Sequence, residues 1–403
     1  MSDFSQPSTP APAGIAEASS AVVVPQEIPS VWREYLPYVV GGVLVVGALA
    51  AFDAFSRRRQ QTPGASSSYS SSSSSAVASA STSASSSPPH VSALYVYPVK
   101  SCAGVRVSRW PVDRYGFRFD RNYMIVREDT GTFVTQRQHP VLALIHPELD
   151  YENGVVSLRK EGHKSVAVST PEDETELDVK VWSDEVKGID MGDEVAAWLT
   201  AVIGVSVRLV KLPHAFQRSP PEAFVAHLSP ADYINVIAYP DCFPFLLASE
   251  ASRAWIEKAT QELAEDPTFQ VGLNRFRPNI VIDGKMEPFE EDTWGKIDIL
   301  LQSAELSDDD ETEDDEESSR PAVLRLSFGR HCTRCSIPNI AQETATRSPW
   351  VNKVLEHHRH LQDKVEGPAR VFGVQYVHSE AGALVSVGDQ LVIKERVDPP
   401  QLD

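Results

Sequence analysis

Hydrophobic and polar positions alternate over short stretches through most of the chain after residue 90, which is typical of β-strands. These runs are rich in β-branched and aromatic residues. They predict early strands in VSALYVYPVK, YMIVRED, FVTQRQ, LALIHPEL, VVSLRK, SVAVST, LDVKVWSD and VRLVKLP. Later strands are predicted in DYINVIAY, FRPNIVIDG, GKIDILLQ and AVLRLSFG. VFGVQYVHSE and ALVSVGDQLVIKE are expected to form a closing strand pair around Gly388.

Three segments have helical periodicity instead. In MGDEVAAWLTAVIG the apolar residues share one face, and Gly204 is expected to end the helix. A second helix is predicted to begin at about Ser249. A third is predicted in SPWVNKVLEHHRHLQDKV, with Ser348 as N-cap and Pro349 at the first helical position.

These elements predict a mostly β chain of the α+β class. Two β-barrel-like domains are expected, the first at residues 91–215 and the second at residues 216–398. Strands and helices do not alternate as they do in βαβ units, so a Rossmann sheet is not expected.

A long apolar stretch precedes these domains. YLPYVVGGVLVVGALAAFDAF, within residues 32–56, carries one acidic residue, and about 20 apolar residues span a bilayer. The stretch predicts a single-pass membrane anchor between a disordered N-terminus (residues 1–31) and a Ser-rich linker (residues 57–90). Three arginines follow the anchor directly, so the positive-inside tendency predicts that the later domains face the cytosol.

Charge is unevenly spread along the chain. The formal net charge is −19, and SDDDETEDDEESS at residues 307–319 contains nine acidic residues. Such a block repels itself and predicts a disordered insert. An acidic chain without a basic stripe is a poor candidate for nucleic-acid binding, so no nucleic-acid partner is expected. Four cysteines in 403 residues are no disulfide framework, which favours a reducing compartment.

Common nucleotide and hydrolase signatures are missing from the sequence: GxGxxG, GxxxxGK[ST], HExxH and GxSxG do not occur. Instead, polar side chains recur where predicted strands end. They are Lys100, Ser101, Arg121, Arg137, Arg277 and Asn279. Taken singly, each cation is an ordinary surface residue. Together they can hold a phosphate, because arginine binds anions in a planar, bidentate way and lysine acts as a point charge.

Two of the four cysteines, Cys332 and Cys335, lie three residues apart in GRHCTRCSIPN. A structural zinc ion usually takes four ligands, and a reactive dithiol prefers a helix directly after the motif, whereas Pro338 follows here. The cationic neighbours favour a thiolate over an inert buried thiol. A zinc site, a redox dithiol and a single thiolate on a soft metal with an anionic cofactor all remain open.

Seven motifs resemble, in order, those of MOSC-domain proteins, and among them the mitochondrial amidoxime-reducing components. They are YPVKSC, FDRNYMIV, TQRQHP, AYPDCFPFLLASEAS, NRFRPNIVIDG, CTRC and VGDQLVI, within residues 91–393. The resemblance implies a MOSC N-terminal β-barrel domain followed by a MOSC β-barrel domain. It also implies a molybdenum cofactor, a molybdopterin with a terminal phosphate, whose metal takes one protein thiolate.

The resemblance also assigns roles to residues by motif position. It places the metal thiolate at Cys335 and a catalytic, proton-relaying carboxylate at Asp241. The cofactor-binding positions that it implies are Lys100, Ser101, Arg121, Cys242, Arg277, Asn279 and Arg334.

The chain departs from the family pattern at two places. Cys242 and Phe243 replace a small polar pair, which removes hydroxyl contacts to the cofactor. In the loop after the implied metal thiolate, Ala341 and Gln342 replace an Asp-Pro pair, and Ala345 replaces a glycine. Because this loop is expected near the mouth of the site, the departures leave the substrate range open.

The resemblance implies a membrane-anchored oxidoreductase that reduces small N-hydroxylated substrates, amidoximes and hydroxylamines, to amidines and amines. A b-type cytochrome and its NADH-dependent reductase are the expected electron donors. The expected location is the outer mitochondrial membrane, with the catalytic part facing the cytosol. A molybdenum cofactor carrier or sulfur-transfer module without reductase activity remains an alternative, as does a binding protein that has lost the metal. Pyridoxal phosphate binding is not expected, because only an anchor and a linker precede residue 91.

Overall fold

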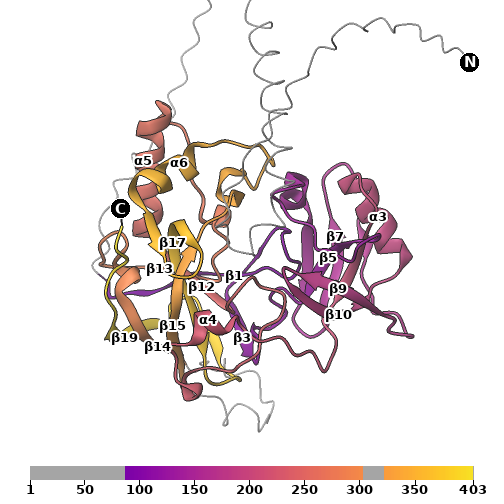
Figure 1. Ribbon diagram of the computed structural model, residues 1–403, viewed down its shortest axis with the longest axis horizontal. Helices are drawn as coiled ribbons and strands as arrows, with labels where there is room; N and C mark the ends of the chain where they lie inside the picture. The colour runs from indigo at the N-terminus through magenta and orange to yellow at the C-terminus, as the bar shows by residue number, and fades with distance from the viewer. Residues whose placement is uncertain (1–86, 303–321, 403) are drawn as a thin grey trace, which may run out of the picture. The chain divides into compact units, whose positions relative to one another are not determined.

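The computed structural model describes residues 87–302 and 322–402 (Figure 1). These residues belong to one compact unit. The predicted disordered N-terminus, membrane anchor, acidic insert and most of the linker lie outside the described residues. Within the described ranges, no helix is long and apolar enough to cross a membrane.

Seven strands of the described chain close into a barrel, which confirms the prediction of a mostly β chain. The structure closes one barrel among the described strands, where two barrel-like domains were predicted. In order they are β12 (Phe245–Ser249), β13 (Ile280–Asp283), β1 (His90–Val96), β19 (Gln390–Arg396), β14 (Trp294–Leu300), β15 (Val323–Thr333) and β17 (Gly367–His378). The barrel closes because β17 also pairs with β12, where Leu247 lies opposite Val374. Two short strands, β2 (Val105–Val107) and β16 (His360–Asp363), pair with β1 and β17.

The strand β13 is buried on both faces over Ile280–Ile282, and these three residues are apolar. Successive side chains of a strand point to opposite sides. Ile280 and Ile282 therefore pack inside the barrel, whereas Val281 joins a second core with α5 (Glu250–Ala264) and α6 (Trp350–His358). Each fully buried aliphatic side chain contributes about 1.5–3 kcal/mol.

The connection from β12 through α5 to β13 is a βαβ unit, since the two strands pair in parallel. The prediction that the chain lacks such units is wrong at this place. Ser249 begins the helix as predicted, with its side chain accepting from the Ser252 N–H at 3.0 Å. The Glu291 carboxylate accepts from the backbone N–H of Ser249 and from both serine hydroxyls. Glu291 thus fixes the corner between strand and helix.

The remaining strands form smaller sheets. An antiparallel sheet contains β5 (Tyr123–Arg127), β11 (Val207–Lys211), β10 (Asp184–Asp190) and β9 (Glu176–Val181). The helix α3 (Asp193–Ile203) packs on it and ends at a left-handed Gly204, as predicted. In Figure 1 they form the indigo-to-magenta lobe. The other strands are β6 (His146–Asp150), β7 (Gly154–Arg159), β8 (Val166–Ala167), β3 (Arg109–Asp113), β4 (Gly116–Phe117) and β18 (Leu384–Ser386).

Some local predictions are wrong. DYINVIAY forms no strand, because only the turn η3 (Pro230–Asp232) and irregular chain precede β12. FVTQRQ has only isolated bridges before a turn, and LALIHPEL begins with the 3-10 helix η2 (Pro140–Leu144). In the third predicted helix, Pro349 rather than Ser348 stands at the N-cap, and the helix ends at His358, before β16.

The predicted closing strand pair is also wrong. The strand β17 pairs with β15, β12 and β16, β18 pairs with β3, and β19 pairs with β14 and β1. Gly388 still makes the turn between β18 and β19, with a φ of 99°. These neighbours in sequence separate because β17 and β19 take partners from other segments of the barrel, while β18 joins a separate sheet.

Glu291 generates a prediction about stability and pH. Its carboxyl is fully buried, and desolvation together with Asp292 raises its pKa from 4.5 to about 7. The folded state therefore retains this proton to a higher pH than the unfolded chain, and the associated stability is lost as pH rises from about 4.5 through 7. Glu291→Gln should remove up to about 3 kcal/mol of that loss. Urea unfolding at pH 5 and pH 8 measures it.

Glu287→Gln is the matched control, because Glu287 is exposed on the neighbouring loop. We expect this variant to keep the pH dependence of the wild type. An unchanged pH dependence in Glu291→Gln would show that the buried carboxyl does not titrate in this range.

Candidate functional site

The turn after β1 holds the first two predicted anion-binding residues. Lys100 and Ser101 are both buried, and the Lys100 backbone N–H donates to the carbonyl of Tyr123. The Lys100 Nζ donates to the Tyr239 carbonyl at 2.8 Å and to Asp241 Oδ1 at 2.5 Å. The structure therefore joins the predicted cation Lys100 to the predicted catalytic carboxylate Asp241.

Asp241 presents an anionic carboxylate to solvent. Its side chain is 60% exposed, and its Oδ1 also accepts from Trp182 Nε1 at 3.0 Å. Desolvation alone would raise the pKa of this carboxyl, but the Lys100 ammonium and the Trp182 hydrogen bond hold it well below its usual range. At neutral pH Asp241 is therefore an acceptor. The proton of the pair resides on Lys100, whose pKa is lowered by burial.

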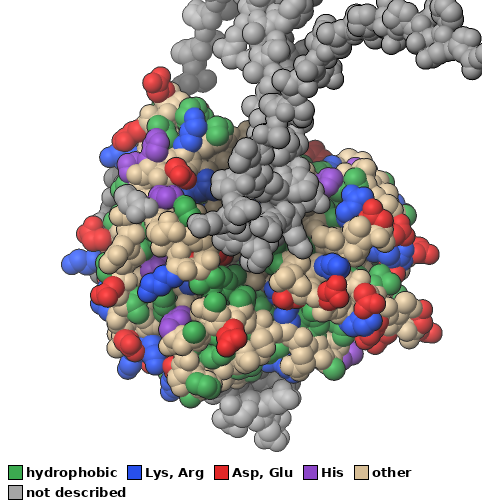
Figure 2. All heavy atoms as spheres, in the orientation of Figure 1, with side chains coloured by type: hydrophobic (Ala, Val, Ile, Leu, Met, Phe, Trp, Pro, Cys, Tyr) green, Lys and Arg blue, Asp and Glu red, His purple; other side chains and the backbone are tan. Residues whose placement is uncertain are grey.

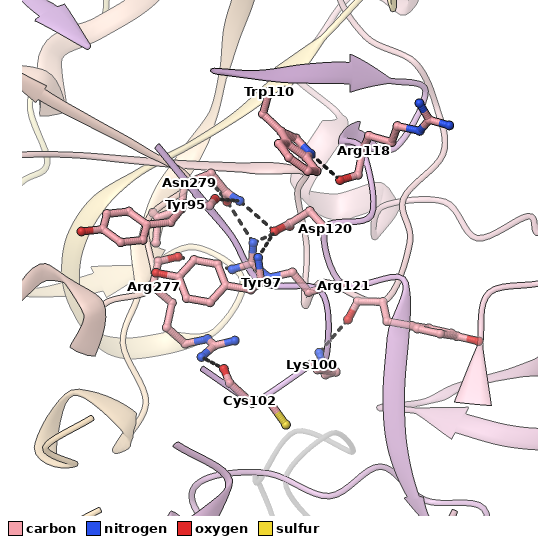
Figure 3. Close-up of polar contacts among 12 residues, drawn as sticks. Tyr95, Tyr97, Lys100, Cys102, Trp110, Arg118, Asp120, Arg121, Arg277 and Asn279 are labelled. Carbon is pink, nitrogen blue, oxygen red and sulfur yellow. Dashed lines mark hydrogen bonds and ion pairs between the residues drawn. The ribbon is translucent and has the colours of Figure 1, made fainter. Parts of the chain in front are cut away.

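A buried carboxylate organises the other predicted positions (Figure 3). Asp120 accepts from the Tyr97 backbone N–H at 2.8 Å and from Asn279 Nδ2 at 3.0 Å, and it forms an ion pair with Arg121. Arg121 also donates to Asn279 Oδ1 at 3.0 Å and to the Arg277 carbonyl at 3.3 Å. Desolvation nevertheless raises the pKa of Asp120. The Arg121 guanidinium thus has a structural task within the protein.

Arg277, in contrast, retains an open donor. Its Nη1 donates to the Cys102 carbonyl at 2.5 Å, while its buried Nη2 has no partner among the described residues. The guanidinium groups of Arg277 and Arg121 lie 4.2 and 4.6 Å from the Tyr97 ring centre. Burial lowers the pKa of Arg277 to about 10, so it remains cationic at neutral pH. A buried cation with an unpaired N–H is suited to an anionic ligand.

Three of the predicted anion-binding residues have left-handed backbone conformations. The φ angles are 69° at Ser101, 50° at Arg121 and 60° at Arg277. This conformation costs a non-glycine residue about 1–2 kcal/mol, and such strain persists only where surrounding contacts impose it. Six other non-glycine residues of the described chain share this conformation, so it shows that contacts hold these three backbones in place and does not by itself mark a functional site.

The two cysteines of the CTRC motif have different surroundings. Cys332 is buried at the end of β15, and its sulfur accepts from Arg334 Nη1 at 3.0 Å. Arg334 also donates to the Phe276 carbonyl at 2.8 Å, and its buried Nε has no partner in the described chain. Cys335 is only partly buried, and its carbonyl accepts from Asn352 Nδ2 of α6 at 3.0 Å. The arginine therefore contacts Cys332 and leaves Cys335 available.

Cys242 lies in an apolar cluster with Phe243 and Val377. Burial and the neighbouring Asp241 raise the pKa of its thiol to about 12. A contact from Cys242 to a cofactor would therefore be made by a neutral thiol.

Sequence reasoning missed several contributors to this site. Asp120 had a weak local signal, since it precedes an arginine in FDRN. Trp182 had none, because the tryptophan lies 59 residues from Asp241. The Arg137 guanidinium lies 4.8 Å from the centre of the Trp182 ring, so another predicted cation lies near Asp241. Tyr97, the shared platform of two arginines, was also missed.

The described residues contain no group of three or more His, Cys, Asp or Glu side chains placed to hold a metal ion. On the face seen in Figure 2, acidic and basic side chains are interspersed rather than gathered by sign.

Two protein families match the sequence: the MOSC N-terminal beta barrel domain over residues 89–206 and the MOSC domain over residues 235–392. Molybdenum cofactor sulfurase of Homo sapiens is 28% identical over 325 residues, which are 77% of this chain and 33% of the relative. Mitochondrial amidoxime reducing component 2 of Bos taurus is 34% identical over 54% of this chain and 62% of its own length. Mitochondrial amidoxime-reducing component 1 of Homo sapiens is 29% identical over 75% of this chain and 82% of its own length. The chain thus spans less than two thirds of the sulfurase and of the bovine relative.

The different roles of Arg121 and Arg277 predict different effects on stability. Arg121→Ala leaves the Asp120 carboxylate buried without its ion-pair partner, which should cost about 3–5 kcal/mol at pH 7. The loss should be smaller at pH 5, because a protonated Asp120 no longer needs the pair. Urea unfolding at the two pH values measures both effects.

Arg277→Ala is the comparison variant, because it removes a cation that already has an unpaired N–H. We expect a loss of about 1 kcal/mol or less, comparable to one hydrogen bond. Equal losses of unfolding free energy in the two variants would contradict a structural role for Arg121 that Arg277 lacks.

Proposed function

This chain is a MOSC-domain protein, and on that premise we propose that it binds the molybdenum cofactor and reduces N-hydroxylated compounds. The net conversion is R–NH–OH, with two electrons and two protons, to R–NH2 and water. The N–O bond breaks, and the oxygen leaves as water. Amidoximes and hydroxylamines are the proposed substrate class. The amidoxime-reducing relatives, at 29–34% identity, support this class.

Two buried arginine N–H groups without a hydrogen-bond partner in the described chain carry the proposal. One belongs to Arg277 and the other to Arg334, the residue before Cys335. Arg277 Nη2 and Arg334 Nε have no partner among the described residues, and a buried donor without an acceptor costs about 1–3 kcal/mol. Each of these donors is suited to an anionic acceptor. The residues therefore fit a phosphate-bearing cofactor, with Lys100 and Ser101 in the adjoining turn.

When bound, the cofactor supplies a two-electron redox centre that can remove oxygen from nitrogen. Cys335 is the proposed thiolate ligand of its metal, because a thiolate suits a soft metal and this thiol is partly exposed. The Arg334 guanidinium donates a hydrogen bond to the Cys332 sulfur, so the Cys335 sulfur stays available as the proposed ligand.

Lys100 is proposed to donate a proton, and Asp241 is proposed to orient the substrate. The Lys100 Nζ holds a proton between the Tyr239 carbonyl and Asp241 Oδ1. Its pKa is lowered by burial, so it donates that proton more readily than an exposed lysine does. Asp241, ionised and exposed, can accept a hydrogen bond from an N–H or O–H group of the substrate. We therefore assign Asp241 an orienting role and Lys100 the role of proton donor.

Electron donors and location are also part of the proposal. A b-type cytochrome and its NADH-dependent reductase are the proposed donors. The apolar stretch at residues 32–56 is the proposed anchor in the outer mitochondrial membrane, with the catalytic part facing the cytosol. Its length and the arginines that follow it support the anchor.

A molybdenum cofactor carrier or sulfur-transfer module is the second candidate. It is favoured by the similarity to molybdenum cofactor sulfurase over 77% of this chain. Purification of the full chain from a cofactor-producing host separates the candidates, through the molybdenum content and the NADH-dependent reduction of benzamidoxime in the presence of cytochrome and reductase. Molybdenum with turnover supports the reductase, and molybdenum without turnover supports the carrier. Absence of molybdenum would rule out both.

The thiolate assignment predicts unequal effects of two conservative substitutions. Cys335→Ser should abolish benzamidoxime reduction and alter the molybdenum spectrum, because a hydroxyl is a poor ligand for a soft metal. Cys332→Ser is the matched control, three residues away, and should retain most of the turnover. Equal loss in both variants would point to a dithiol or a shared metal site instead.

A further inference from the structure

Two glutamines that lie 206 residues apart form a reciprocal amide pair. Gln136 belongs to the turn that follows Phe133, and Gln342 belongs to the loop that follows Cys335. Gln136 Nε2 donates to Gln342 Oε1 at 3.1 Å, and Gln342 Nε2 donates to Gln136 Oε1 at 3.0 Å. Gln136 is fully buried and Gln342 is 8% exposed.

Both amide groups are also satisfied outside the pair. Gln136 Nε2 donates to the Ser101 carbonyl at 2.7 Å, and Gln342 Nε2 donates to the Ile340 carbonyl at 3.1 Å. All four amide N–H groups therefore have acceptors. A buried polar network in which every donor is paired favours a single arrangement over alternatives, because any shift leaves buried groups unpaired.

We propose that this pair is a positioning element that fastens the loop after Cys335 to the turn carrying Lys100 and Ser101. The proposed thiolate and the proposed anion-binding turn belong to segments that are far apart in the sequence, and the amide pair links them directly. Where it concerns retention of the molybdenum cofactor, this inference rests on the proposed function. Gln342 is one of the positions at which this chain departs from the family pattern, so the device is a property of this chain.

The loop after Cys335 makes other contacts that are exposed, so the buried amide pair should hold it to the turn that carries Lys100 and Ser101. The same loop reaches the 135–138 turn through Arg347, whose Nη2 donates to the Arg137 carbonyl at 2.5 Å, but Arg347 is exposed. Glu343 accepts from Asn274 Nδ2 at 2.7 Å and is also exposed. Solvent can replace these exposed contacts, whereas it cannot easily replace the buried amides.

Hydrogen exchange of the full-length chain, followed by mass spectrometry, tests the inference. Gln342→Met keeps a long side chain and removes only the amide. It should accelerate exchange about tenfold in its own loop, at Ala341 and Ala345, and equally in residues 99–103, where the Lys100, Cys102 and Ala103 amides donate to backbone carbonyls. Gln136→Met tests the coupling from the opposite side and should accelerate the same two segments.

Three comparisons separate coupling from general destabilisation. The double variant should exchange about as fast as the faster single variant, because each substitution already breaks the pair. Gln362→Met, at an exposed glutamine of β16, and Arg347→Ala should leave residues 99–103 unchanged. In the loaded protein, Gln342→Met should release molybdenum several times faster during dialysis.

Acceleration confined to the loop that carries the substitution would overturn the inference, as would additive effects in the double variant. The exchange measurements do not require a bound metal. If the chain holds no molybdenum, the proposed function fails, but the hydrogen-exchange measurements still show whether the two loops are coupled.

Discussion

The buried ion pair between Asp120 and Arg121, in the turn between β4 and β5, is the interaction on which the candidate site depends. A carboxylate in a medium of low polarity is stable only when its charge and its lone pairs are matched. Meeting that requirement fixes the Tyr97 backbone, the Arg121 guanidinium and the Asn279 amide together. Arg121 then extends to the Arg277 carbonyl, so segments about 150 residues apart adopt their positions around one charge.

Local signals in the sequence were enough to predict part of the fold. Gly204 and Ser249 correctly marked a helix end and a helix start, because a cap depends on the residues next to it. The alternation of apolar and polar residues likewise identified most strands. It could not identify their partners, since the same pattern fits any neighbour that buries the apolar face. The parallel contact of β12 with β13 therefore appeared only in the structure.

The candidate site shows the same limit more sharply. Cations at strand ends were visible in the sequence, but their mutual arrangement was not. Asp241 meets Lys100 across 141 residues and Trp182 across 59. The family resemblance pointed to Asp241 and Lys100 without showing that they touch. Tyr97 had no signal, because a tyrosine in an apolar strand predicts packing, whereas here it lies against two guanidinium groups.

The position of β1 in the barrel also has a consequence for how the protein is made. Leu94 pairs with Ile280, and His90 pairs with both Asp283 and Gln390. On the ribosome, β1 is synthesised among the first residues of the barrel, yet its last partner strand is completed near the C-terminus. The hairpin partner β2 follows directly and β13 follows later, but the contact of His90 with Gln390 of β19 forms only after 300 further residues. Until β19 is available, the barrel has an open strand edge, and open edges of apolar strands are prone to wrong pairing.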